Sequence, residues 1–230
     1  YVDDVAQGMS GTPQHILATL PVAASDLGAD LVAQGGVVSP KSLVVASHPG
    51  LARAIAKSIR TAGYEVKAAS VGRDLGVDFA GGKRRRLPTI RARHLKGIRR
   101  LGRIKKLTRV TRKARRLAKT GALPQVAWGA QCMGIAPTTM KRLRSQYARA
   151  LGHDTSNKCT TTAIALAQDL DPSASVALDM VRQFFKYWPL APASRQQDIQ
   201  QVWAKLVRAH SPYPNWRVVA GPLGALVATL

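Results

Sequence analysis

The chain has 230 residues and carries 35 lysines and arginines against 12 acidic residues, a formal net charge of +23 at pH 7. Self-repulsion on this scale opposes compaction unless a polyanion binds, and phosphate backbones are the usual partner. The sequence holds no uninterrupted run of 18 apolar residues and only two cysteines, so we expect no membrane partner, no disulfide framework and an intracellular, reducing location.

Residues 1–80 are predicted to be mixed α/β. Apolar residues at spacings of three and four after Pro13 predict a helix that ends at Gly35-Gly36. Pro21 lies inside it and predicts a kink or two abutting helices. A second helix is expected from Leu51 to Ala62. Short β segments are expected at 5–11, 37–38, 43–45, 64–68 and 75–79, with a hairpin turn at 70–72.

Residues 81–154 are strongly basic. Between Lys83 and Lys119, 18 of 37 residues are lysine or arginine, and no acidic residue occurs between Asp78 and Asp154. A solvated helix usually mixes charge signs to gain pairs four residues apart. Apolar residues recur through the basic stretch, which favours helix over a disordered tail. We expect helices at 88–119, broken near Gly97 or Gly102, and at 138–151.

Residues 155–230 are predicted to form further helices. Apolar stripes at helical spacing mark 160–170, 173–187 and 194–209. The last stripe contains Ile199, Val202, Trp203 and Leu206, and such stripes more often face a core than a ligand. Trp188, Trp203 and Trp216 have aromatic faces on which bases stack, but two of them lie in or beside apolar stripes and are predicted to be core. The fold class expected from the whole pattern is α+β.

The first four residues, Tyr1-Val2-Asp3-Asp4, form the motif richest in chemistry. Two adjacent carboxylates at a tight turn supply the oxygen ligands that Mg²⁺ prefers. In two-metal phosphoryl transfer, one ion activates the attacking hydroxyl and the other stabilises the leaving group. The alternative is an ordinary turn with two aspartates.

Further motifs follow in a fixed order. A helix ending in Gly35-Gly36 leads into Val37-Val38-Ser39-Pro40-Lys41-Ser42, and Asp74-Leu75-Gly76-Val77-Asp78-Phe79 comes before the basic stretch. The segment 121–130, GALPQVAWGA, comes after it. In this order the motifs resemble reverse transcriptases, in particular those of non-LTR retrotransposons and group II introns. The resemblance covers residues 1–150.

The resemblance implies a partial palm at 1–80, a basic helical thumb at 81–154 and a connector or further domain at 155–230. Asp3 and Asp4 would hold Mg²⁺, and Lys41 would approach the phosphates of the incoming nucleotide. Tyr1, Val2, Leu75 and Gly76 would position the primer. The template–primer backbone would be bound by Arg84, Arg85, Arg86, Arg91, Arg93, Lys96, Arg99, Arg100, Arg103, Lys105, Lys106, Arg109, Arg112, Lys113, Arg115 and Arg116.

The family also needs a metal-binding aspartate from an earlier strand, which would lie before Tyr1. We therefore expect the isolated chain to be incomplete and inactive as an RNA-directed DNA polymerase. The partners implied are an RNA template, an RNA–DNA hybrid and a deoxynucleoside triphosphate, in a nuclear or ribonucleoprotein-associated location. The alternatives are a non-catalytic basic nucleic-acid-binding module, in which the Asp3-Asp4 pair is a coincidence, and a decayed mobile element.

Overall fold

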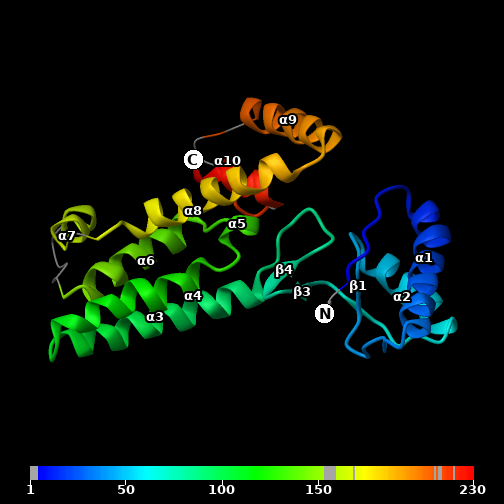
Figure 1. The fold of residues 1–230 in the computed structure, drawn as a ribbon, viewed down its shortest axis with the longest axis horizontal. Coiled ribbons are helices and arrows are strands. Elements are labelled where there is room, and N and C mark those ends of the chain that lie inside the picture. Colours follow the sequence, from blue (N-terminus) through cyan, green and yellow to red (C-terminus); the bar gives the residue numbers. More distant parts are fainter. Residues whose placement is uncertain (1–4, 153–158, 168, 210, 212–213, 220) are drawn as a thin grey trace. The chain divides into compact units, whose positions relative to one another are not determined.

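The computed structural model describes residues 5–152, 159–167, 169–209, 211, 214–219 and 221–230. The chain divides into two compact units, Tyr1–Leu87 and Pro88–Leu230. Helices predominate in the described residues, and the strands form two small two-stranded sheets (Figure 1). The coarse α+β prediction is therefore confirmed.

Helix α1 (Pro13–Ala33) begins the first unit. Thr12 caps it by accepting a hydrogen bond from the backbone N–H of His15, and Pro13 takes the first-turn position that suits proline. The helix continues through Pro21, so the predicted alternative of two abutting helices is wrong.

Helix α1 is also apolar enough to be compared with a membrane span. Its mean hydropathy of 1.5 over 18 residues would allow it to cross a membrane by length and composition, although the sequence has no uninterrupted apolar run of that length. One such helix near the N-terminus is weak evidence for a span. Here Ile16, Leu20 and Ala24 pack against the core of the first unit.

That core is built around helix α2 (Pro49–Thr61). Ala52, Ile55, Ala56 and Ile59 are its buried residues, spaced so that they share one face. They pack against Val44 and Val66. Strand β1 (Leu43–Val45) precedes α2 and strand β2 (Lys67–Ala69) follows it, and the two strands pair in parallel.

The predicted hairpin around residues 70–72 is wrong. Strand β2 pairs with β1, and the hairpin joins β3 (Gly72–Asp74) to β4 (Val77–Phe79). Its turn is Leu75-Gly76, with φ of 44° and 78°. Two successive positive φ values give the turn whose twist matches that of antiparallel strands, and Gly76 adopts its value without strain. The β segments expected at 5–11 and 37–38 are irregular instead.

The second unit is helical throughout its described residues. Its first helix, α3 (Pro88–Thr108), continues through Gly97 and Gly102, where a break was predicted, and ends before residue 119. The elements that follow are η1 (Arg112–Arg115), η2 (Ala118–Ala122), α4 (Leu123–Ala127), α5 (Ala130–Met133), α6 (Pro137–Ala150), α7 (Thr160–Leu166), α8 (Pro172–Tyr187), η3 (Trp188–Leu190), α9 (Ala193–Arg208) and α10 (Gly221–Thr229).

Helix α6 is the centre of this unit, packed between α3 and α8 (Figure 1). Its Leu143 and Tyr147 are fully buried, as is Leu101 of α3. Tyr147 donates a hydrogen bond of 2.8 Å to Asp169. Burial and this hydrogen bond raise the pKa of Tyr147, so the hydroxyl remains a donor.

The apolar stripe of helix α9 was predicted to be buried in the core, but it is only partly buried. None of the residues of this helix is buried, and Val202 is 44% exposed. The stripe reaches the rest of the unit through Trp203, which is partly buried against the core. Periodicity located the helix correctly, but it could not show that little packs against it.

The ion pair of Asp171 with Arg144 joins three helices. Asp171 caps α8 by accepting a hydrogen bond from the backbone N–H of Ser173. Arg144 of α6 donates to both of its oxygens and forms an ion pair of 2.7 Å. The same guanidinium donates to Thr161 of α7 at 2.6 Å. Partial burial opposes ionisation of Asp171, but the hydrogen bonds from Arg144 and Ser173 outweigh it and hold the pKa below the usual 3.8.

We predict that Asp171→Asn lowers the free energy of unfolding at pH 7 by about 1–3 kcal/mol, because Arg144 loses its charged partner while the cap is kept. A depressed pKa gives stability that is present above pH 3.8 and is lost as pH falls through the folded value. The gap between wild type and variant should therefore close on acidification. Urea unfolding at several pH values, with Asp198→Asn as control, measures this. A gap that stays constant down to low pH would contradict it.

Gly97 lets α3 approach α4 closely. A Cβ at this position would collide with the Val126 side chain. At Gly102 of the same helix, nothing lies within 4 Å of an added Cβ. Both glycines are in the helix interior, where alanine is ordinarily the more stable residue.

We predict opposite effects of alanine at these two positions. Gly102→Ala should stabilise the protein by about 0.5–1 kcal/mol through helix propensity. Gly97→Ala should destabilise the wild type by about 1–3 kcal/mol through overpacking. The same substitution made in the Val126→Ala variant should destabilise that variant by less, because the colliding side chain is gone. Chemical denaturation of the four variants tests this. Stabilisation by Gly97→Ala would show that α3 and α4 are not held in close contact there.

Candidate nucleic-acid interface

Helix α3 has one apolar face and one basic face. Its buried residues are Ile90, Gly97, Leu101 and Ile104, and the last two belong to the core of the bundle. Away from that face, cations are spaced three and four residues apart, so successive side chains stand one above another. We call Lys96, Arg99, Arg100 and Arg103 the α3 stripe, and all four are exposed.

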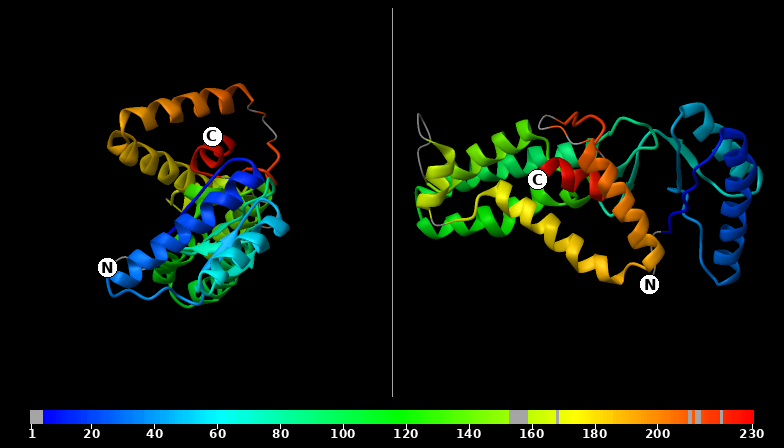
Figure 2. Two further views of the ribbon diagram at one scale, coloured as in Figure 1. Left: turned by 90° about the vertical axis from the view of Figure 1, so that its right-hand side faces the viewer. Right: turned by 90° about the horizontal axis from the view of Figure 1, so that it is seen from above.

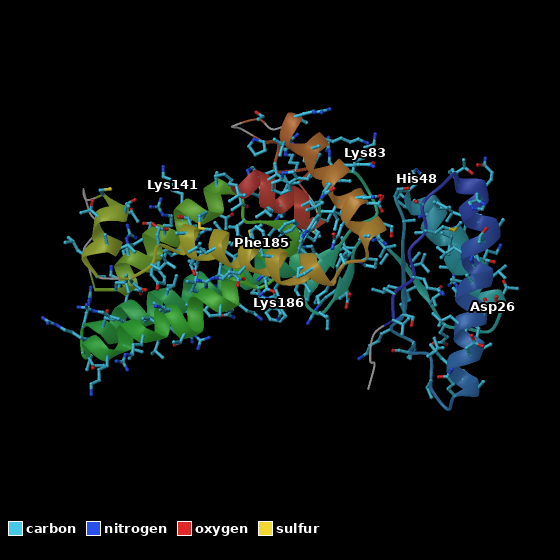
Figure 3. The ribbon with its side chains drawn as sticks, turned by 45° about the horizontal axis from the view of Figure 1, so that its top comes forward. Asp26, His48, Lys83, Lys141, Phe185 and Lys186 are labelled. Atoms are coloured by element: carbon cyan, nitrogen blue, oxygen red, sulfur yellow. The ribbon has the colours of Figure 1, made fainter. Side chains whose placement is uncertain are left out.

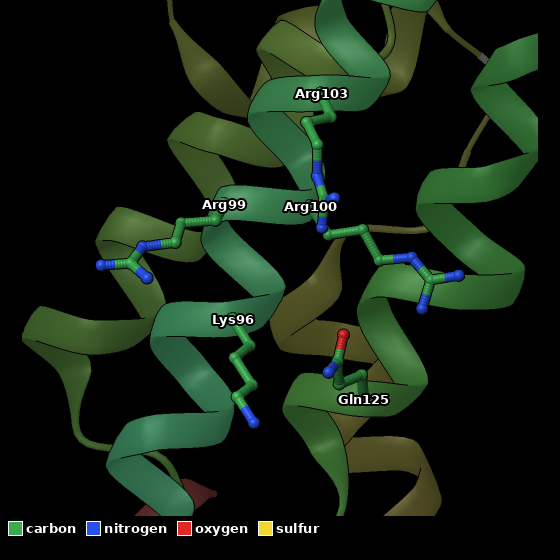
Figure 4. Close-up of a pocket in the computed structure, with 5 residues that line it drawn as sticks. All are labelled: Lys96, Arg99, Arg100, Arg103 and Gln125. Atoms are coloured by element: carbon green, nitrogen blue, oxygen red, sulfur yellow. The ribbon is translucent and has the colours of Figure 1, made fainter.

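The α3 stripe lines one side of an open hollow of about 390 Å³. Gln125 of α4 lies on the opposite side (Figure 4). Lys96 and Gln125 both extend into the space between the two helices, and Arg100 reaches across it. The hollow thus offers positive charge together with an amide that both donates and accepts hydrogen bonds.

Arg100 is held in place by the segment that folds back beside α3. Its Nη1 donates a hydrogen bond of 3.3 Å to the carbonyl oxygen of Gly121 in η2. A Cβ on residue 121 would lie 2.9 Å from this guanidinium, so glycine permits the approach. Two turns nearer the start of α3, Arg93 donates to the carbonyl of Trp128 at 3.2 Å. An arginine has five N–H donors, so Arg100 keeps donors for a ligand.

Three carboxylates of the second unit are engaged away from the α3 stripe. Asp169 pairs with Lys119 at 3.6 Å, Asp171 pairs with Arg144, and Asp179 accepts a hydrogen bond from Gln131 at 2.6 Å. Within the described residues, Lys96, Arg99 and Arg103 form no ion pair. No described carboxylate pairs with these three cations, so the solvent ions that gather around them are available for a polyanion to displace.

The predicted metal ligands Asp3 and Asp4 lie outside the described residues, as do Tyr1 and Val2, which were predicted to position the primer. The other predicted residues of the first unit are placed. Lys41 is exposed in the turn between α1 and β1, where its backbone N–H donates to Ser39 Oγ at 3.2 Å. Leu75 and Gly76 form the β3–β4 turn, with Leu75 74% exposed and Gly76 buried.

The predicted phosphate contacts fall into three segments. Those numbered 84–86 precede α3, those from 91 to 106 lie on it, and those from 109 to 116 lie in the segment after it that contains η1. All are exposed except four that are partly buried: Arg85, Arg93, Lys105 and Arg115. Sequence analysis missed Gln125 and Gly121, because no local pattern shows that η2 and α4 return alongside α3.

No described group of three or more His, Cys, Asp or Glu side chains gathers to hold a metal ion. The two cysteines lie in different elements. Cys132 is in α5, where burial raises the pKa of its thiol, and Cys159 precedes α7, where hydrogen bonds from Thr162 and Thr161 lower the pKa of its thiol to about 7.

Comparison with known proteins identifies no relative of this chain, so the interface is interpreted from its own geometry. No family model, no curated protein and no solved structure matches the chain.

Proposed function

We propose that the chain is the rear palm and the thumb of an RNA-directed DNA polymerase from a mobile element, and that α3 binds the backbone of its template–primer duplex. The α3 stripe supports this most directly. It gathers four exposed cations on one face of a helix whose opposite face is buried, and none of the four forms an ion pair with a carboxylate in the described chain.

The spacing of the α3 stripe suits a phosphate backbone. Cations three or four residues apart along a helix rise by about 4.5–6 Å. Phosphates of one strand of a duplex rise by about 3.4 Å along its axis, so side chains as long as lysine and arginine can reach successive phosphates. Arginine adds paired N–H donors that match phosphate oxygens. Contacts of this kind hold a duplex without reading its sequence, as a polymerase requires.

The catalytic part of the proposal begins with two residues outside the described chain. Asp3 and Asp4 would hold Mg²⁺, which would supply charge stabilisation for transfer of a nucleotide from a deoxynucleoside triphosphate. Lys41 and the Leu75-Gly76 turn would serve the nucleotide and the primer. We propose an RNA template, an RNA–DNA hybrid product and a nuclear or ribonucleoprotein-associated location on the same basis.

We predict that a triple substitution on α3 weakens binding to an RNA–DNA hybrid and lowers its dependence on salt. With Lys96, Arg99 and Arg103 replaced by glutamine, the slope of log affinity against log salt should fall by about 2–3, because each lost phosphate contact removes about 0.7–0.9 from it. Fluorescence anisotropy with a labelled hybrid at several salt concentrations measures the slope.

The matched control removes the same charge from the first unit. Arg53, Lys57 and Lys67 are exposed there, and their replacement by glutamine should change the slope much less. Equal losses from the two triple variants would mean that net charge, and not α3, drives binding. No loss from either would contradict the proposal that α3 binds the duplex.

A further inference from the structure

The end of α8 carries an aromatic group that divides into an inner and an outer part. Phe184 faces inward, with its ring centroid 5.6 Å from that of Trp188 and 6.1 Å from that of Trp203. Phe185 meets Phe184 edge-on at 5.6 Å but is itself 67% exposed. The inner rings come from α8, η3 and α9. Figure 2 shows the place where α8 and α9 meet.

The outer part combines exposed rings with cations. Arg182 is three residues before Phe185 on the same side of α8, and Lys186 follows it. Tyr187 is 57% exposed, and Lys186 Nζ lies 5.4 Å from the centre of its ring. Figure 3 marks Phe185 and Lys186 at this end of the helix. We call Arg182, Phe185, Lys186 and Tyr187 the α8 platform.

Charge favours a polyanion at the α8 platform. Both Arg182 and Lys186 are exposed, and neither forms an ion pair within the described residues. The one carboxylate on α8, Asp179, accepts a hydrogen bond from Gln131 of α5. An exposed ring flanked by unpaired cations offers a surface to the face of a base and charge to its phosphate.

We propose that the α8 platform binds single-stranded nucleic acid, with an unpaired base stacked on Phe185 and phosphates held by Arg182 and Lys186. This inference rests on the proposed function. The α3 stripe would bind the duplex part of the template–primer, and the α8 platform, in the same unit, would bind the single-stranded part. The α8 platform and the α3 stripe lie on separate helices with α6 packed between them, so substitutions can separate their roles.

The test compares oligothymidine with a blunt RNA–DNA hybrid in equilibrium binding to the full chain. Phe185→Leu keeps an apolar side chain but removes the aromatic face. It should weaken oligothymidine binding by about 5- to 150-fold, the range for loss of one base stacked on an aromatic side chain. Hybrid binding should stay within twofold, and Phe185→Trp should retain oligothymidine binding. Leu166→Ala, a change at another exposed apolar position (72% exposed), is the control.

Unchanged oligothymidine binding by Phe185→Leu would overturn this inference while leaving the α3 proposal in place. An equal loss of hybrid and oligothymidine binding would overturn it as well. If Phe185→Leu lost only oligothymidine binding but the triple substitution on α3 lost no hybrid binding, the proposed function would fail and the α8 platform would stand. A dimer in the wild type that becomes a monomer in Phe185→Leu would identify a protein interface and overturn the inference.

Discussion

Helix α3 combines an exposed face of closely spaced cations with a face that is buried in the core of the second unit. Cations at close spacing repel one another, and the α3 stripe has no neighbouring carboxylate in the described chain to offset that repulsion. What stabilises the helix is its other face, where Leu101 is fully buried and Ile104 nearly so. Burial of an aliphatic side chain contributes about 1.5–3 kcal/mol, so a few such residues can offset the repulsion. The charge is thereby fixed in position and ready for a ligand.

The scarce carboxylates of the second unit stabilise junctions between helices. Asp171 links α8 to Arg144 of α6, which in turn reaches Thr161 of α7, and Asp169 binds both Tyr147 and Lys119. Asp179 connects α8 to α5 through Gln131. Each of these aspartates holds the bundle together at a distance in sequence from the α3 stripe. The bundle is therefore tied by local pairs of opposite charge while the basic face remains unneutralised.

Local sequence patterns predicted the long elements of this protein well. The apolar spacing of α1, α2, α6, α8 and α9 predicted these helices because one turn of helix is specified by residues close together in the chain. Strand pairing was not predictable in the same way. Nothing near Val44 identifies Ala68 as its parallel partner, and the hairpin turn was expected at 70–72 but lies at Leu75-Gly76. The cations of the candidate interface were predicted, whereas Gln125 and Gly121 were not, because their place beside α3 depends on the path of the chain through η2.

The central claim is that a nucleic-acid duplex lies against the α3 stripe. Lysine acylation with and without a bound RNA–DNA hybrid, read by mass spectrometry, tests it most directly. Lys96 and Lys106 of α3 and Lys57 of α2 are all exposed in the free protein, so each should react readily without ligand. We predict that the hybrid shields Lys96 and Lys106 but leaves Lys57 reactive. Equal labelling of Lys96 with and without hybrid, under conditions where the complex forms, would contradict the claim.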